Sequence, residues 1–182
     1  MRLPFHIKMS PIIIGIGGGH SGVGKTTIAC KVLQRFPGWG AIKYTKTSLY
    51  ASITDDVDVL SEKDKDTKRF LDSGAEKVLW VRSPFHELPE ILPTAVEMLS
   101  HLKGIVVEGN GAIDVLGPDI VVFVFGPEGE IKSGAGKILR MADIIIFDRE
   151  LPPETPQAGK KFRRDEAEKF LDFIGVIKNM KN

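Results

Sequence analysis

Apolar residues in this chain gather in short runs, and the segments between the runs are polar or show helical periodicity. The runs span residues 12–16, 39–44, 78–81, 105–108, 120–125 and 143–147. They are too short for buried helices, and several consist mainly of β-branched residues. Strands of a parallel sheet look like this because both of their faces are covered. The runs therefore predict six strands of a mostly parallel sheet.

The segments between these runs predict the helices that cover the sheet. We expect helices at 26–36, which Pro37-Gly38 ends, and at 67–74, 88–102 and 133–141, whereas 46–68 is expected to be mostly loop. An amphipathic C-terminal helix is expected within 159–182, with apolar residues from Phe162 onward. Alternating strands and helices with right-handed crossovers predict a doubly wound α/β fold. We expect a single domain over 1–182, of which residues 1–11 form a short leader.

One stretch after the first strand carries specific chemistry. Residues 19–26 match the phosphate-loop pattern G-x-x-x-x-G-K-[S/T], the P-loop. Glycines allow backbone N–H groups to point at phosphate oxygens, and the following helix adds the positive end of its dipole. We expect Lys25 to reach the β and γ phosphates of a nucleoside triphosphate, and Thr26 to offer its hydroxyl to Mg²⁺. The residues expected to bind the nucleotide are Gly19, His20, Ser21, Gly22, Val23, Gly24, Lys25, Thr26 and Thr27.

Acidic residues at strand ends are the candidates for completing this site. Ligands of such sheets bind beyond the carboxyl ends of the strands. Glu108 ends an apolar run, so it is a candidate for holding Mg²⁺ or orienting the attacking nucleophile. Asp55 is a second candidate for the same two roles, and a solvated acidic loop is its alternative interpretation. Asp148 follows the last run, where an acid can read a guanine base.

Basic residues at the second strand's end and a later glycine-containing turn are weaker candidates. Lys43, Tyr44 and Lys46 point to where phosphates or a substrate would lie. Residues 133–137 read Ser-Gly-Ala-Gly-Lys, which resembles a phosphate loop without its spacing. A glycine-containing start of a helix explains that stretch as well.

Composition and charge exclude several function classes. The net charge of +1 does not point to nucleic acid or to a membrane surface as a partner. No apolar run reaches the ~18 residues that span a bilayer. The single cysteine, Cys30, excludes a disulfide framework and fits a cytoplasmic protein. The four histidines are scattered, which disfavours a metallochaperone.

Four stretches resemble molybdopterin-guanine dinucleotide biosynthesis protein B (MobB) and its P-loop relatives. They are Gly17–Thr27, Ala41–Lys46, the run Lys65-Asp66-Thr67 with Arg69 and Ser73-Gly74-Ala75, and Val106–Gly109. The chain departs from the family after the second strand, where Tyr44 and Lys46 replace histidines, and after Gly109, where Asn110-Gly111 stand.

This resemblance implies a GTP-binding protein with slow hydrolysis, a homodimer and a molybdenum-cofactor nucleotidyltransferase as partner. The residues by themselves leave GTP and ATP open. They also leave open an ATP-dependent small-molecule kinase or ligase, a metallochaperone-like GTPase and a non-catalytic nucleotide-dependent adaptor.

Overall fold

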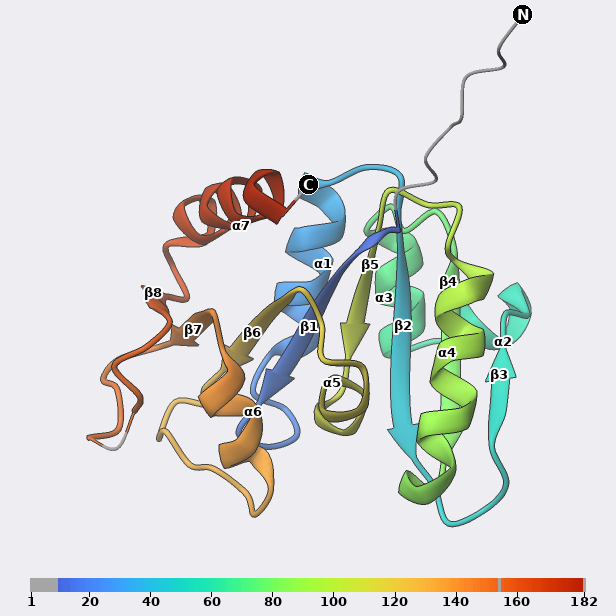
Figure 1. Ribbon diagram of the computed structural model, residues 1–182, viewed down its shortest axis with the longest axis horizontal. Coiled ribbons are helices and arrows are strands. Elements are labelled where there is room, and N and C mark those ends of the chain that lie inside the picture. The colour runs from blue at the N-terminus through green and yellow to red at the C-terminus, as the bar shows by residue number, and fades with distance from the viewer. Residues whose placement is uncertain (1–9, 154, 182) are drawn as a thin grey trace, which may run out of the picture.

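The computed structural model describes residues 10–153 and 155–181 and is built around one β-sheet (Figure 1). Within these residues the strands are β1 (Ile12–Gly18), β2 (Trp39–Lys46), β3 (Ser52–Thr54), β4 (Val78–Ser83), β5 (Gly104–Glu108), β6 (Ile120–Val124), β7 (Ile144–Phe147) and β8 (Lys160–Arg163). Their order across the sheet is β3-β4-β2-β5-β1-β6-β7-β8. The two strands β3 and β4 run antiparallel, and every other neighbouring pair is parallel. The leader expected at 1–11 lies almost entirely outside the described residues.

Helices cover both faces of this sheet. They are α1 (Lys25–Arg35), α2 (Val57–Leu60), α3 (Asp66–Asp72), the 3₁₀ helix η1 (Phe85–Glu87), α4 (Leu88–Met98), α5 (Asn110–Leu116), α6 (Ala135–Met141) and α7 (Ala167–Lys181). Buried residues of α1, α3 and α7 share one apolar cluster, whereas α4, α5 and α6 pack on the opposite face (Figure 1). The predicted doubly wound α/β fold is confirmed. No helix in the described ranges has the length and apolar character to cross a membrane.

The central strands are apolar on both faces because each face meets a helix layer. Ile12, Ile14 and Ile16 of β1 belong to the cluster with α1 and α7, whereas Ile13 packs against the cluster that contains α4. All five residues of β5 are buried. The continuous apolar runs in the sequence are therefore the pattern of a sheet covered on both sides.

Residues 46–68 contain a strand that the sequence did not predict. The three residues of β3 are each half-buried and pair antiparallel with β4, Ser52 opposite Arg82 and Thr54 opposite Trp80. A short, polar edge strand has no distinctive apolar pattern, because solvent covers part of it. Its stability comes from the ladder with β4, which local sequence does not reveal.

A helix follows β5 directly, although it begins with a pair of residues that favours turns. Helix α5 begins at Asn110, directly after Gly109, whose φ of 137° lies in the region that favours glycine. The pair Asn110-Gly111 is typical of turns, but buried Ala112 and Ile113 pack against the sheet and stabilise a helix instead.

The C-terminal helix begins later than predicted. Residues Lys160–Arg163 form β8 at the edge of the sheet, with Phe162 buried opposite Ile146 of β7, and α7 starts only at Ala167. The Glu166 carboxylate accepts a hydrogen bond of 2.8 Å from the Arg163 backbone N–H in the turn between them. A single apolar residue between charged ones fits both a strand and a helix, and pairing with β7 decides for the strand.

The register of the central strands brings distant residues to the carboxyl edge of the sheet. Glu108 at the end of β5 lies opposite Ile16 of β1 and Lys43 of β2. At the other end of these strands, Gly104 lies against the indole of Trp39, which is only 2% exposed. This close approach of β5 to β2 requires glycine at position 104.

Gly104→Ala is expected to destabilise the protein by about 1–3 kcal/mol, because the added methyl group would overlap the buried Trp39 ring. Urea unfolding of the variant and the wild type measures the difference.

Gly175→Ala is the matched control. Gly175 lies inside α7 with no atom near its missing Cβ, so alanine is expected to stabilise the protein by about 0.5–1 kcal/mol. Equal effects of the two substitutions on stability would contradict the close packing of Gly104 against Trp39.

Candidate functional site

The loop between β1 and α1 has the conformation that its glycines predict. Gly22 and Gly24 have φ of 79° and 93°, and Gly24 is the residue directly before α1. A side chain at Gly19 would overlap the backbone oxygen of Glu130. Positive φ values turn successive N–H groups toward one side, which makes an anion-binding concavity at the start of an eleven-residue helix.

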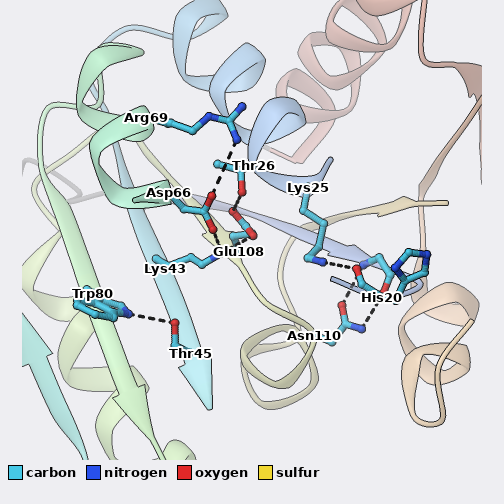
Figure 2. Close-up of polar contacts among 11 residues, drawn as sticks. His20, Lys25, Thr26, Lys43, Thr45, Asp66, Arg69, Trp80, Glu108 and Asn110 are labelled. Atoms are coloured by element: carbon cyan, nitrogen blue, oxygen red, sulfur yellow. Dashed lines mark hydrogen bonds and ion pairs between the residues drawn. The ribbon is translucent and has the colours of Figure 1, made fainter. Parts of the chain in front are cut away.

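Lys25 lies over this loop without a carboxylate in direct contact. Its ammonium donates a hydrogen bond of 2.7 Å to the backbone oxygen of His20 (Figure 2). Burial lowers the pKa of Lys25, and the positive charges of Lys43 and Lys132 add to this, although Glu108 and Asp66 act in the opposite direction. Such a desolvated cation is poised to bind an anion.

Thr26 and Glu108 are in direct contact at the buried end of the loop. The Thr26 hydroxyl donates to Glu108 Oε2 at 2.9 Å, although 82 residues separate them in the chain. Both side chains are buried, with Glu108 only 2% exposed. The structure therefore brings together two of the three residues that were expected to hold Mg²⁺, Thr26 and Glu108.

Lys43 joins Glu108 to a second acid that the sequence analysis did not single out. Its ammonium donates to Glu108 Oε1 and to Asp66 Oδ2, both at 2.6 Å (Figure 2). Burial by itself would lower the pKa of Lys43, but the two carboxylates outweigh it and raise that pKa. Asp66 starts α3 and had stood out only as part of the Lys65-Asp66-Thr67 resemblance, which was the available signal for it.

Asp66 and Arg69 connect α3 to the loop. Burial would raise the pKa of Asp66, but the hydrogen bond and charge of Lys43, with smaller contributions from Thr26 and Arg69, lower it. Arg69 donates to the Thr27 hydroxyl at 2.9 Å. Cys30, also on α1, donates its thiol to the Arg69 backbone oxygen at 3.5 Å.

Asp55 lies away from this group. It follows β3, which runs back toward the beginning of β4, and it pairs with Lys77 at 3.0 Å. Because β3 is antiparallel to β4, the chain runs away from the carboxyl ends of the parallel strands, and Thr54, just before Asp55, already lies opposite Trp80. The structure does not bring Asp55 to the loop. The acid that shares Lys43 with Glu108 is Asp66.

Asp148 is engaged by an arginine that the sequence analysis did not identify. Arg164, just beyond β8, donates to Asp148 at 2.7 and 3.2 Å and to the backbone oxygens of Val23 and Phe125 at 2.9 Å. Because β8 is an edge strand without a clear pattern, no local signal pointed to Arg164. Asp148 therefore lies beside the phosphate loop and acts on it through Arg164.

Asn110 supports the loop from the other side. Its amide group accepts from the Gly18 N–H and donates to the Gly18 oxygen, both at 2.9 Å (Figure 2). Val23 is buried under the loop, and the Lys132 N–H donates to the Gly19 oxygen at 2.9 Å. These contacts hold the end of β1 and the start of the loop in place.

A cavity of about 520 Å³ opens over the loop. Its lining includes Ser21 to Thr27 without Val23, Lys43 to Lys46, Asp66, Arg69, Glu108 and Gly109. In the described part of the chain, no group of three or more His, Cys, Asp or Glu side chains could hold a metal ion by itself. Two carboxylates and a hydroxyl suit Mg²⁺, which takes few protein ligands and shares its shell with phosphates.

The fold and this loop define an α/β protein with the P-loop NTPase fold. The chain is similar to HypB from Helicobacter pylori, solved in complex with nickel, with 13% identity, a TM-score of 0.61 and coverage of 96% of this chain and 89% of that chain. Also similar is a MobB homolog from Bacillus stearothermophilus, with 16% identity, a TM-score of 0.49 and coverage of 92% and 98%.

A nucleotide-binding protein from Archaeoglobus fulgidus, in complex with ADP, matches at 13% identity and a TM-score of 0.41, over 92% of this chain and 88% of that chain. No protein-family model and no curated protein matches the sequence. The likeness to HypB confirms the expected P-loop NTPase fold.

Asp66→Asn is expected to lower the stability of the free protein by about 1 kcal/mol at pH 7, because the charged partner of Lys43 is lost and water screens the half-buried site. The lowered pKa of Asp66 means that its contribution is present above the unfolded pKa of about 3.9 and is lost as the pH falls through the lower folded pKa. The difference between variant and wild type should therefore shrink as the pH falls below about 4.

Urea unfolding between pH 7 and the lowest pH with a cooperative transition measures this difference. Asp72→Asn is the control on the same helix, since Asp72 is exposed and pairs with the exposed Lys68. A difference for Asp66→Asn that does not change with pH would contradict the role of its charge.

Proposed function

We propose that this protein binds a nucleoside triphosphate with Mg²⁺ over the P-loop and hydrolyses it. The observation that supports this most directly is the 2.9 Å contact between Thr26 and the buried Glu108, beside a desolvated Lys25. A glycine-rich turn that binds nothing would not require a buried carboxylate in contact with the threonine that follows it. The cavity of about 520 Å³ has room for a triphosphate.

In this proposal Thr26, Asp66 and Glu108 hold the metal ion. When bound, Mg²⁺ would neutralise part of the negative charge on the phosphate oxygens. Glu108 fixes the Thr26 hydroxyl, whereas Asp66 is 38% exposed and lines the cavity. The geometry thus favours Asp66 for the roles of metal ligand or water-orienting acid that were considered for Asp55.

Lys25 would bind the β and γ phosphates as a point charge, together with the loop N–H groups. Loss of its contact with the His20 oxygen is compensated by charge-assisted hydrogen bonds to phosphate. Because these donors are already oriented, they stabilise charge that develops during phosphoryl transfer without reorganisation.

We further propose a MobB-like role: GTP as the nucleotide, a homodimer as the working form and a molybdenum-cofactor nucleotidyltransferase as partner. Residues from all four stretches of the resemblance line one cavity, which supports a shared role for them. Leu49 and Tyr50, 69% and 74% exposed, lie just beyond Lys46 and offer apolar surface for a second copy.

A small-molecule kinase or ligase is the second candidate, because a further cavity of about 480 Å³ adjoins the loop. It shares Lys25 with the first cavity and is lined by Lys46, Lys132 and Phe85, among others. An anionic acceptor placed there would lie next to the terminal phosphate. The loop around 133–137 contributes to this cavity through Ser133, Gly134 and Ala135.

Isothermal titration with Mg²⁺·GTP and Mg²⁺·ATP tests the leading proposal. We expect binding by the wild type and a loss of at least about 100-fold, or about 2.7 kcal/mol, in Lys25→Ala, because the phosphate charges lose their partner. The variant should unfold no earlier than the wild type, since a desolvated charge has been removed.

A preference for GTP with slow phosphate release would favour the MobB-like role. A preference for ATP with turnover only in the presence of an acceptor would favour the kinase or ligase. No binding of either nucleotide by the folded wild type would refute the proposal.

Asp148→Asn distinguishes base recognition from support of the loop. Since Asp148 contacts Arg164 and Arg164 holds Val23, we expect the variant to weaken GTP and ATP binding by the same factor, about 3- to 10-fold. A change in the ratio of the two affinities would instead show that Asp148 reads the base.

A further inference from the structure

Lys43 already neutralises the acids that the proposed function assigns to the metal ion. Its ammonium is 2.6 Å from one oxygen of Glu108 and 2.6 Å from one oxygen of Asp66. Lys43 is 17% exposed and Glu108 only 2%. A carboxylate buried to the degree of Glu108 requires a counter-cation, and here Lys43 provides it.

This ammonium and a bound Mg²⁺ compete for the same oxygens. Mg²⁺ requires ligand oxygens at about 2.0–2.1 Å in a strict octahedron. Lys43 directs its ammonium between the two carboxylates, and the Thr26 hydroxyl donates to the other oxygen of Glu108 (Figure 2). A metal ion held by Thr26 and Asp66 therefore weakens the hold of these acids on Lys43.

Charge balance indicates where Lys43 would go. The charged side chains that line the cavity are Lys25, Lys43, Lys46 and Arg69 against Asp66 and Glu108. This lining is net positive, and Mg²⁺·triphosphate brings net negative charge. Lys43 lines the cavity over the loop, and its flexible stem allows the ammonium to turn from the acids to phosphate oxygens.

We propose that Lys43 is an internal counter-cation that exchanges with Mg²⁺: it holds Asp66 and Glu108 before binding and passes to the terminal phosphate when Mg²⁺·triphosphate binds. This inference rests on the proposed function and assigns to Lys43 the discrimination between triphosphate and diphosphate. It also makes the contact between β2 and α3 depend on the nucleotide, because Lys43 is the residue of β2 that binds Asp66.

The competition is measurable without nucleotide, with Mn²⁺ as the probe and electron paramagnetic resonance of the free ion as the readout. Lys43→Gln removes the charge but keeps an N–H donor, so we expect Mn²⁺ to bind about 10-fold tighter than to the wild type. Lys43→Arg holds carboxylates in a bidentate fork, so Mn²⁺ should bind more weakly than to the wild type.

Lys65→Gln is the matched control. This substitution also removes a positive charge, one residue from Asp66, but the ammonium of Lys65 pairs with Glu62. It should bind Mn²⁺ as the wild type does. Thermal unfolding establishes that each variant is folded. If Lys43→Gln does not fold, the comparison of Lys43→Arg with the wild type still tests the competition.

A second measurement compares a non-hydrolysable triphosphate with the diphosphate, each with Mg²⁺, by isothermal titration. The wild type should prefer the triphosphate, and Lys43→Gln should lose about 10-fold of that preference. Mn²⁺ affinity that is unchanged or lower in Lys43→Gln, or an intact preference for triphosphate, would overturn the exchange. Failure of the wild type and of every variant to bind nucleotide would refute the proposed function. The ranking of Mn²⁺ affinities among Lys43→Gln, wild type and Lys43→Arg would still test the competition between Lys43 and the metal ion.

Discussion

The carboxylate of Glu108 is the group to which the rest of the site is tied. It is buried at the end of β5, and its two oxygens accept from Thr26 on α1 and from Lys43 on β2. An isolated carboxylate in such a position costs several kcal/mol, so its partners are held in place as well. Through Lys43 the same network reaches Asp66 and α3. One buried charge thus fixes the relative positions of four elements.

Lys25 shows the opposite balance of forces. It is half-buried, its ammonium donates to a backbone oxygen, and burial lowers its pKa. A cation held only by a backbone oxygen is stabilised less than one paired with a carboxylate, and proteins often accept such a loss of stability where a function requires it. Lys43, whose pKa is raised by its acids, is the satisfied counterpart of Lys25 on the same cavity.

Residues outside the cavity determine how rigid the phosphate loop is. Asn110 holds the end of β1 through the backbone N–H and C=O of Gly18. Arg164 binds the backbone oxygens of Val23 and Phe125, and Asp148 orients Arg164. Because the loop N–H groups must be aimed before a phosphate arrives, such supports affect binding without touching the ligand. Of these supports, Asn110 also lines the second cavity, beyond Lys25.

The sequence by itself determined the phosphate loop, the six main strands and the doubly wound fold, because each depends on local composition and periodicity. It also identified Glu108, since a strand that ends in an acid beside a P-loop is a local pattern. Only the tertiary structure decided that Asp66 rather than Asp55 joins the site, because the antiparallel pairing of β3 with β4 returns residue 55 to the far edge. The pairing of Asp148 with Arg164 was decided in the same way, by the docking of β8 on β7, since a contact between distant segments depends on which strands pair and in which direction.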